Sequence, residues 1–138
     1  MVSSPPHQHG EGVMTILEAL LWLTLNVYHE ARSEPRIAQM AVANVTLNRA
    51  REQGAKIEEI VRQPRQFSWT DQKGSFIPDD PKAFVHCLQS VYLALQGEDF
   101  TGGATHFHLD SVKPSWAAEY IYLTQLGAHK FYRQQPGS

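Results

Sequence analysis

The apolar positions at the start of the chain predict two packed helices. From Val13 to Val27, apolar residues cover most of a helical circumference, so the helix expected from about Met14 to Arg32 is typical of a central core helix. Ser33-Glu34-Pro35 then breaks this helix, because a proline disfavours a helical residue before it and suits a first turn. A second helix is predicted from Pro35 to Arg51, with Gly54 as its terminator.

Two further helices follow, with a shorter extended stretch between them. Lys56 to Gln63 has the pattern of a short amphipathic helix. Gln66 to Thr70 alternates aromatic and polar residues, which predicts a short strand or an extended loop. Asp80 is the expected N-cap of another helix, with Pro81 at its first position and Gly97 at its end.

The last third of the chain changes to a period of two, which is typical of strands. Thr101 to Ala104 predicts a tight bend and Thr105 to His108 a strand. Residues 120–126 and 129–133 predict a hairpin around Gly127. The fold class that follows is α+β, mainly α, with a small antiparallel β hairpin or sheet in the C-terminal third.

Composition indicates one domain with a proper core. We expect it at residues 13–133, between a flexible leader at residues 1–12 and a tail at residues 134–138. The 138 residues are 42% hydrophobic and 19% charged, and the net charge of −2 argues against a nucleic acid partner. Cys87 is the one cysteine, so no internal disulfide is possible, and its apolar neighbours predict a buried thiol.

The sequence shows neither a signal peptide nor a comfortable membrane span. Residues 1–12 lack the basic start and apolar run of a secretory leader. The apolar run that follows is interrupted by Glu18, Thr24 and Asn26. We therefore expect no stable membrane insertion, and a chain that stays in the cytoplasm unless another protein releases it or a leader has been removed.

Glu30 is the strongest candidate for chemistry, because it lies at the end of the long apolar helix. A carboxylate is costly to bury there unless it is paired or protonated, and the negative end of a helix also favours its neutral form. Both effects raise its pKa, which a general acid needs. Aromatic residues such as Trp69 and Trp116 can stack on sugar rings and suggest a carbohydrate substrate.

Five blocks of sequence, in order, resemble one known family. They are YHEARSEP, AQMAVANVTLNR, IVRQPRQFSW, TGGATHFH and GAHKFYR. They are similar to the SleB/CwlJ cell wall hydrolase family, which includes spore cortex-lytic enzymes and related phage endolysins. The resemblance extends to about Arg133 and implies a lysozyme-like catalytic domain that cleaves peptidoglycan between N-acetylmuramic acid and N-acetylglucosamine. Better-known members act as lytic transglycosylases.

The resemblance also implies a set of site residues and a mechanism. The glutamate of the family's E-A-R motif falls on Glu30, which would act as acid and then as base, without a metal or other cofactor. His106 and His108, which strand alternation places on one face with Phe107 opposite, stand where many relatives carry tyrosines. His29 stands where many relatives carry glycine. We expect a monomer that binds peptidoglycan glycan strands. The expected substrate-binding residues are His29, Glu34, Asn48, Gln66, Ser68, Trp69, Thr105, His106, His108 and Trp116.

Three alternatives remain open from the residues alone. In the first, His106 and His108 bind a metal in an amidase or peptidase, with His29, Glu30 and His129 as further ligands. In the second, a muramidase-type hydrolase uses a second carboxylate. The third is a non-catalytic peptidoglycan-binding module, which would leave Glu30 unexplained.

Several of these residues also have plain structural interpretations. The candidates for a second carboxylate are Glu34 and Asp71, but Glu34 serves equally well as a first-turn acid of the second helix. Asp71 lies in a predicted loop, where a solvated side chain is the simpler reading. Asn44 and Asn48 lie one helical turn apart, and for asparagine a solvated face is more common than a cleft.

Overall fold

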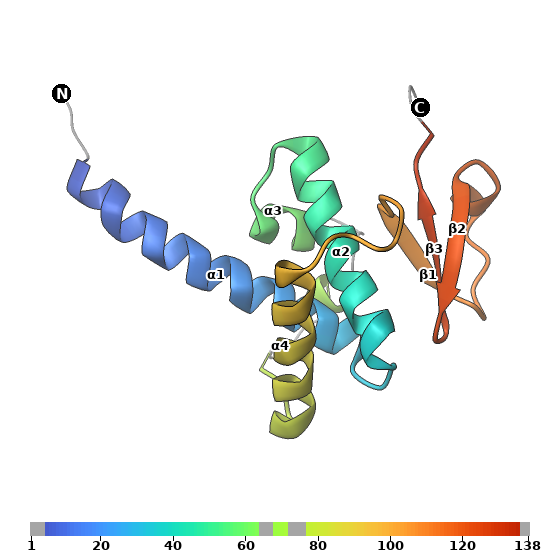
Figure 1. The fold of residues 1–138 in the computed structure, drawn as a ribbon, viewed down its shortest axis with the longest axis horizontal. Helices are drawn as coiled ribbons and strands as arrows, with labels where there is room; N and C mark the ends of the chain where they lie inside the picture. Colours follow the sequence, from blue (N-terminus) through green and yellow to red (C-terminus); the bar gives the residue numbers. More distant parts are fainter. Residues whose placement is uncertain (1–4, 64–67, 72–76, 136–138) are drawn as a thin grey trace.

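The computed structural model describes residues 5–63, 68–71 and 77–135, with side chains from residue 16 onward except those of Ser68 and Asp71. A group of helices packs beside a small sheet (Figure 1). The helices are α1 (Pro5–Ala31), α2 (Arg36–Gln53), α3 (Ile57–Val61) and α4 (Pro81–Gln96). The strands are β1 (His106–Leu109), β2 (Ile121–Leu126) and β3 (His129–Arg133), and two 3-10 turns are η1 (Ser68–Asp71) and η2 (Ser115–Ala118).

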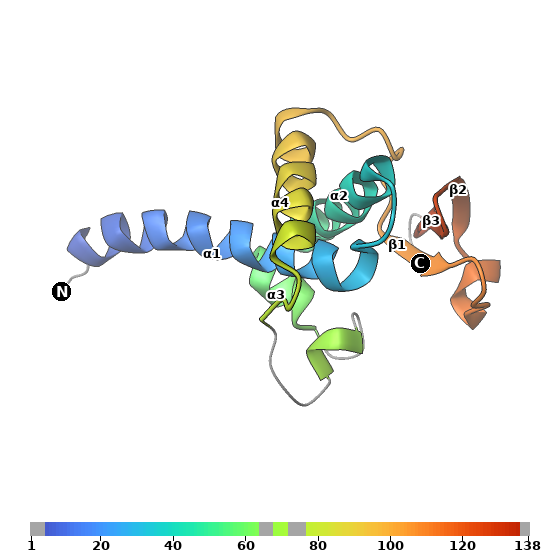
Figure 2. The ribbon, with the colours of Figure 1, turned by 90° about the horizontal axis from the view of Figure 1, so that it is seen from below.

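Only the second half of α1 is a core helix. Leu23, Val27 and Tyr28 are buried against α2 and α4, as the apolar pattern predicted. Ile16 is 70% exposed and Leu17 is also exposed, because this part of the helix projects past the other elements (Figures 1 and 2). The prediction of a helix buried along its whole length is therefore wrong for its first half.

The structure also moves the start of this helix. α1 begins at Pro5 rather than near Met14, so residues 5–12, predicted as a flexible leader, are helical. Prolines fit the first turn of a helix, and a formed turn lets the backbone hydrogen bonds propagate in both directions. Within the described residues, no helix has both the length and the apolar character that a membrane crossing requires.

The predicted ends of the two other long helices are confirmed. Gly54 follows α2 in the left-handed conformation, with φ of 61°. The Asp80 side chain accepts a hydrogen bond of 3.1 Å from the backbone nitrogen of Ala83 and caps α4. Cys87 on α4 is buried, as expected. Around Trp69 the structure has a 3-10 turn instead of a strand or an extended loop.

The sheet is antiparallel with β3 in the middle, in the order β1-β3-β2. β2 and β3 form the predicted hairpin, with Gly127 in its turn at φ of 58°. The register places His106 opposite Tyr132, and Tyr132 opposite Tyr122. The strand order therefore brings side chains of all three strands to one face of the sheet.

Polar contacts tie the segment before the sheet to α2. The Asn48 side-chain nitrogen donates to the carbonyl of Ala104 and to the carboxylate of Asp99, both at 2.9 Å. Asp99 in turn accepts hydrogen bonds from the backbone nitrogens of Thr101 and Gly103. This network fixes the predicted bend and so sets where β1 begins relative to α2.

Candidate active site

A cavity of about 200 Å³ lies where the end of α1, the middle of α2 and strand β1 meet. Three segments distant in sequence supply its walls, and the loop after β1 with η2 closes one side. The lining residues are Glu30, Val45, Arg49, Thr105, His106, Phe107, His108, Val112, Pro114 and Trp116. Five of these lining residues had been predicted as site residues from the sequence: Glu30, Thr105, His106, His108 and Trp116.

Glu30 enters the cavity from the last turn of α1. Among the described residues, its carboxylate has no hydrogen-bond or ion-pair partner. Burial away from water raises its pKa to about 7, from 4.5 for a free side chain. The carboxyl group is therefore largely protonated at mildly acidic pH and can donate a proton to a group that enters the cavity.

His106 faces the same cavity in a neutral state. Its Nδ1 lies 3.0 Å from the Thr105 hydroxyl, and its ring contacts Trp116 and Tyr120 at centroid distances of 5.3 and 4.7 Å. Burial, with a smaller contribution from the charge of Arg49, lowers the pKa of His106 to about 4. An uncharged imidazole next to aromatic rings suits contact with a sugar ring.

His108 is held by hydrogen bonds on both ring nitrogens. Nδ1 lies 2.7 Å from the carbonyl of Leu109, so it carries the proton. Nε2 lies 3.0 Å from the Tyr132 hydroxyl and accepts from it. The ring also stacks on Tyr132 at 5.2 Å. Both ring nitrogens of His108 are therefore within hydrogen-bond distance of protein groups in this structure.

Trp116 completes an aromatic wall on this side of the cavity. Its ring lies 5.7 Å from that of His108 and 5.3 Å from that of Tyr132, both edge-on. Since His106 and His108 point to the same face of β1, their alternation brings them both against Trp116, while Phe107 packs with Phe131 in the core. The predicted division of faces along β1 is confirmed.

Five lining residues were not predicted as site residues from the sequence: Arg49, Phe107, Val45, Val112 and Pro114. A signal for Arg49 was present. It follows Val45 by four residues, so both lie on the α2 face that meets β1, and an arginine on such a buried face is unusual. Phe107, expected on the face opposite His106 and His108, packs against the core and also borders the cavity.

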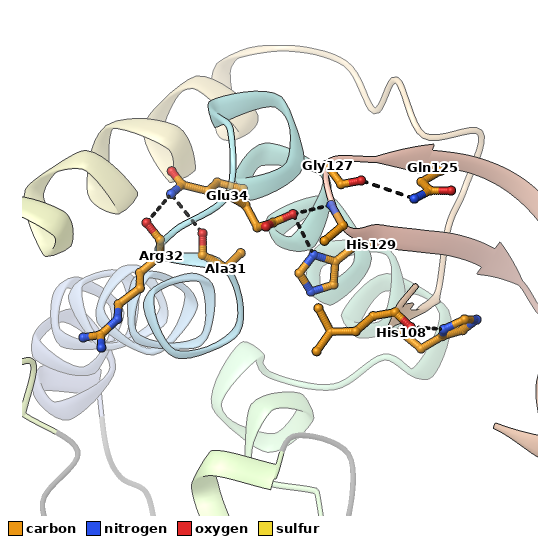
Figure 3. A network of polar contacts seen from close by, with 10 residues as sticks. Ala31, Arg32, Glu34, His108, Gln125, Gly127 and His129 are labelled. Atoms are coloured by element: carbon orange, nitrogen blue, oxygen red, sulfur yellow. Dashed lines mark hydrogen bonds and ion pairs between the residues drawn. The ribbon is translucent and has the colours of Figure 1, made fainter. Parts of the chain in front are cut away.

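Glu34, predicted to bind substrate or act as a second carboxylate, is not among the residues that line this cavity. Figure 3 shows its side chain reaching toward Gly127 and His129. Its carboxylate accepts hydrogen bonds from the backbone nitrogen of Ala128, at 2.6 Å, and from Nδ1 of His129, at 3.3 Å. Burial lowers the pKa of His129, and Glu34 opposes this shift. Glu34 thus anchors the hairpin turn to the junction of α1 and α2.

His29 and Trp69 also lie away from the cavity lining. Their rings stack on one another with centroids 4.4 Å apart. The indole nitrogen of Trp69 donates to the Asn26 side-chain oxygen at 2.8 Å. These contacts join η1 to α1. They also give the N–H of the buried Trp69 indole a hydrogen-bond acceptor. The role of His29 and Trp69 in substrate binding stays a prediction from the sequence.

Asn48, Gln66 and Ser68 complete the predicted set. Asn48 is 3% exposed, as is Asn44, so the solvated interpretation of this face is wrong. The side-chain nitrogen of Asn48 is used by Ala104 and Asp99, and its oxygen accepts from Arg51, which leaves it a structural role. Gln66 lies outside the described residues, and for Ser68 the structure describes only the backbone of η1.

The geometry bears on the two enzymatic alternatives. In the part of the chain that the structure describes, no three His, Cys, Asp or Glu side chains are grouped so that they could hold one metal ion. Among the described lining residues, Glu30 supplies the only carboxylate. The side chain of Asp71, the other candidate acid, is not among those described.

Comparison with known proteins finds relatives that share one name, spore cortex-lytic enzyme. The spore cortex-lytic enzyme of Halalkalibacterium halodurans is 32% identical over 108 residues, which cover 76% of this chain and 32% of that protein. The corresponding enzyme of Oceanobacillus iheyensis is 31% identical over 108 residues, covering 76% of this chain and 38% of that protein. The chain thus spans only about a third of the length of these curated relatives.

Solved structures share the fold. The catalytic domain of the germination-specific lytic transglycosylase SleB from Bacillus anthracis superposes with a TM-score of 0.69 and 25% identity, covering 83% of this chain and 93% of that one. The catalytic domain of the Bacillus cereus SleB protein gives 0.67 and 27%, with coverages of 84% and 91%. The predicted lysozyme-like, mainly helical fold is confirmed. The family model described as Cell Wall Hydrolase matches residues 33–132, which is most of this chain. The chain therefore belongs to the Cell Wall Hydrolase family.

Proposed function

We propose that this chain cleaves peptidoglycan glycan strands between N-acetylmuramic acid and N-acetylglucosamine, as a lytic transglycosylase. The observation that carries the proposal is Glu30, whose carboxyl group has a pKa of about 7, has no polar partner among the described residues and faces a cavity with an aromatic wall. The names of the relatives support the same substrate, since spore cortex-lytic enzymes and a lytic transglycosylase are among them.

The proposed reaction uses one acid twice. Protonated Glu30 donates its proton to the glycosidic oxygen as the bond to the anomeric carbon breaks. The resulting carboxylate then accepts the proton of the C6 hydroxyl of the same muramic acid, whose oxygen attacks the anomeric carbon. The products are a free 4-hydroxyl on one fragment and a 1,6-anhydro sugar on the other. Atoms balance without water, so no group has to activate a water molecule.

The cavity wall would position the sugar for this step. Trp116 and the neutral ring of His106 offer faces and edges for a pyranose ring, and the Thr105 hydroxyl lies beside them. With Glu30 as the only carboxylate among the described lining residues, the site suits an internal nucleophile better than two-carboxylate hydrolysis. For the metal-dependent amidase, both ring nitrogens of His108 would first have to give up their contacts with Leu109 and Tyr132.

We further propose that the chain acts at the cell wall as a monomer on glycan strands. Its family membership supports the wall as the place of action. The monomeric state, the cytoplasmic stage before release and the extent of the catalytic domain at residues 13–133 stay predictions from the sequence.

Mass spectrometry of digested peptidoglycan tests the reaction type. We expect 1,6-anhydro ends from wild-type protein. New reducing ends would instead indicate a muramidase, and freed stem peptides an amidase, and either would contradict the proposal. Glu30→Gln should abolish the products, while Glu98→Gln, an exposed matched control, should retain them. Near wild-type cleavage by Glu30→Gln would remove Glu30 from the mechanism.

A further inference from the structure

Arg49 is a buried cation in the wall of the cavity that contains Glu30. It lies on α2 and is only 8% exposed. Burial of a guanidinium is costly unless an opposite charge and a full set of hydrogen bonds accompany it. The partners of Arg49 therefore decide whether its charge is compensated within the protein.

The described residues leave this charge uncompensated. One terminal nitrogen donates to the side-chain oxygen of Gln63 at 3.1 Å, and the other reaches the carbonyl of Thr105 only at 3.5 Å. Both partners are neutral. The Nε atom is buried and has no hydrogen-bond partner among the described residues. Electrostatic attraction from Tyr120 and from the exposed Glu52 opposes the effect of burial on the pKa of Arg49, and Glu52 forms no ion pair with Arg49 within the described part of the chain.

The other titratable groups of the cavity do not replace the missing counter-charge. Burial keeps Glu30 largely protonated at mildly acidic pH, and His106 is neutral there. Arg49 thus places a positive charge in the wall of the cavity that no carboxylate of the described residues pairs with. A guanidinium with open donor positions is shaped for a carboxylate, which it can bind through two parallel hydrogen bonds.

We propose that Arg49 binds a carboxylate of the substrate strand next to the scissile bond, and so selects acidic over neutral glycan. This inference rests on the proposed function for the identity of the strand. Peptidoglycan offers two sources of that carboxylate. One is the lactyl group on C3 of muramic acid, free where the stem peptide has been removed. The other is the stem peptide itself.

Binding measured without turnover tests the proposal. In a Glu30→Gln background, calorimetry compares three muramic acid–glucosamine tetrasaccharides: with free lactyl carboxylates, with those groups converted to methylamides, and with acidic stem peptides. A charge-assisted pair predicts binding of a carboxylate form about 10- to 100-fold tighter than the methylamide form. Preference for the first tetrasaccharide identifies the lactyl group, and preference for the third identifies the stem. Equal affinity for all three overturns the proposal.

Variants of arginine test whether the charge acts at this position. Glu30→Gln/Arg49→Gln should bind the charged and methylamide forms equally, and Glu30→Gln/Arg49→Lys should recover part of the preference. Arg51, exposed on the same helix and outside the cavity, gives the matched control Glu30→Gln/Arg51→Gln, which should keep the full preference. Loss of the preference in the Arg51 control, or its survival without Arg49, would contradict the assignment.

The outcome separates this inference from the proposed function. The charged-to-neutral comparison uses the Glu30→Gln protein alone, so it stands even where an Arg49 variant fails to fold. Product analysis of wild-type protein is independent of both. Anhydro products without a carboxylate preference would contradict this inference and support the proposed function. Carboxylate-selective binding without anhydro products would support this inference and contradict the proposed function.

Discussion

The carboxylate of Glu34 lies 2.6 Å from the backbone nitrogen of Ala128, at the turn of the β2–β3 hairpin. Residues far apart in the chain are thereby joined: the junction of α1 and α2 on one side and the sheet on the other (Figure 3). An acid that follows Glu30 by one helical turn in sequence is thus committed to holding the sheet in place. This relationship gives Glu34 a role in stability that can be measured.

Removal of this anchor should lower stability without changing the chemistry. Glu34→Ala leaves the Ala128 nitrogen and His129 without their acceptor, so we expect the free energy of unfolding to fall by about 1–2 kcal/mol. Glu34→Gln keeps an acceptor oxygen and should lose less. Urea unfolding measures both. A change in the ratio of anhydro to reducing ends, with stability unaltered, would instead restore Glu34 as a second carboxylate.

Gly127 should tolerate no side chain. Its φ of 58° is left-handed, and an added Cβ would overlap the Glu34 carboxylate and crowd Pro35. Gly54 has nearly the same φ, 61°, with nothing within 4 Å of an added Cβ. Gly54→Ala should therefore lower the free energy of unfolding by only the left-handed cost, about 1 kcal/mol. Gly127→Ala should lower it further, and equal losses by thermal unfolding would show that the contact with Glu34 is unimportant.

The rate of cleavage should fall at alkaline pH. The acid step needs protonated Glu30, whose pKa is about 7 because of burial. We expect kcat to be level below about pH 6 and to fall roughly tenfold per pH unit above the pKa. A pH–rate profile with soluble glycan strands measures this. A rate that rises through pH 7 would require a deprotonated group for the first step and would contradict the assignment.

The raised pKa of Glu30 also predicts that removal of its charge by Glu30→Gln stabilises the fold, by an amount that depends on pH. The folded-state pKa of Glu30 is raised from 4.5 to about 7, so its stabilising neutral form is fully present below pH 4.5 and lost as pH rises through about 7. Glu30→Gln should match wild type near pH 4 and exceed it above pH 7, by up to about 3 kcal/mol. Urea unfolding at several pH values measures the difference, and a difference independent of pH would contradict the raised pKa.

The two tryptophans outside α1 should respond differently to substitution. Trp116→Ala removes part of the cavity wall, and we expect at least about a tenfold rise in KM with a small change in stability. Trp69→Ala removes a buried ring and its hydrogen bond to Asn26, so the free energy of unfolding should fall by about 3–5 kcal/mol. The reverse pattern, in kinetics and unfolding, would exchange their roles.

Local signals in the sequence predicted most elements and the burial of Glu30. The N-cap at Asp80, the terminator at Gly54 and the hairpin at Gly127 depend on neighbouring residues, and each lies where it was expected. Glu30 could be identified because its burial follows from the apolar helix that precedes it. The alternation along β1 also correctly placed His106 and His108 on one face.

Tertiary pairings could not be predicted in the same way. Asn48 and Trp69 are typical of sugar-binding residues, but partners distant in sequence, Asp99 and Asn26, engage their polar groups. Arg49 was missed for the related reason that its burial depends on β1 packing over α2. The exposed first half of α1 has core-like residues, and hydrophobic pattern alone does not say whether another element covers them.

The division of the cavity between distant segments has a consequence for synthesis. Glu30 and Arg49 belong to helices made early, whereas Thr105, His106 and Trp116 come from the last third of the chain. A chain leaves the ribosome N-terminus first, and a domain generally folds as a unit. A nascent chain therefore contains Glu30 before the residues of the cavity wall that would bind a sugar next to it have been synthesised. We expect lytic activity only after nearly the whole chain has been translated.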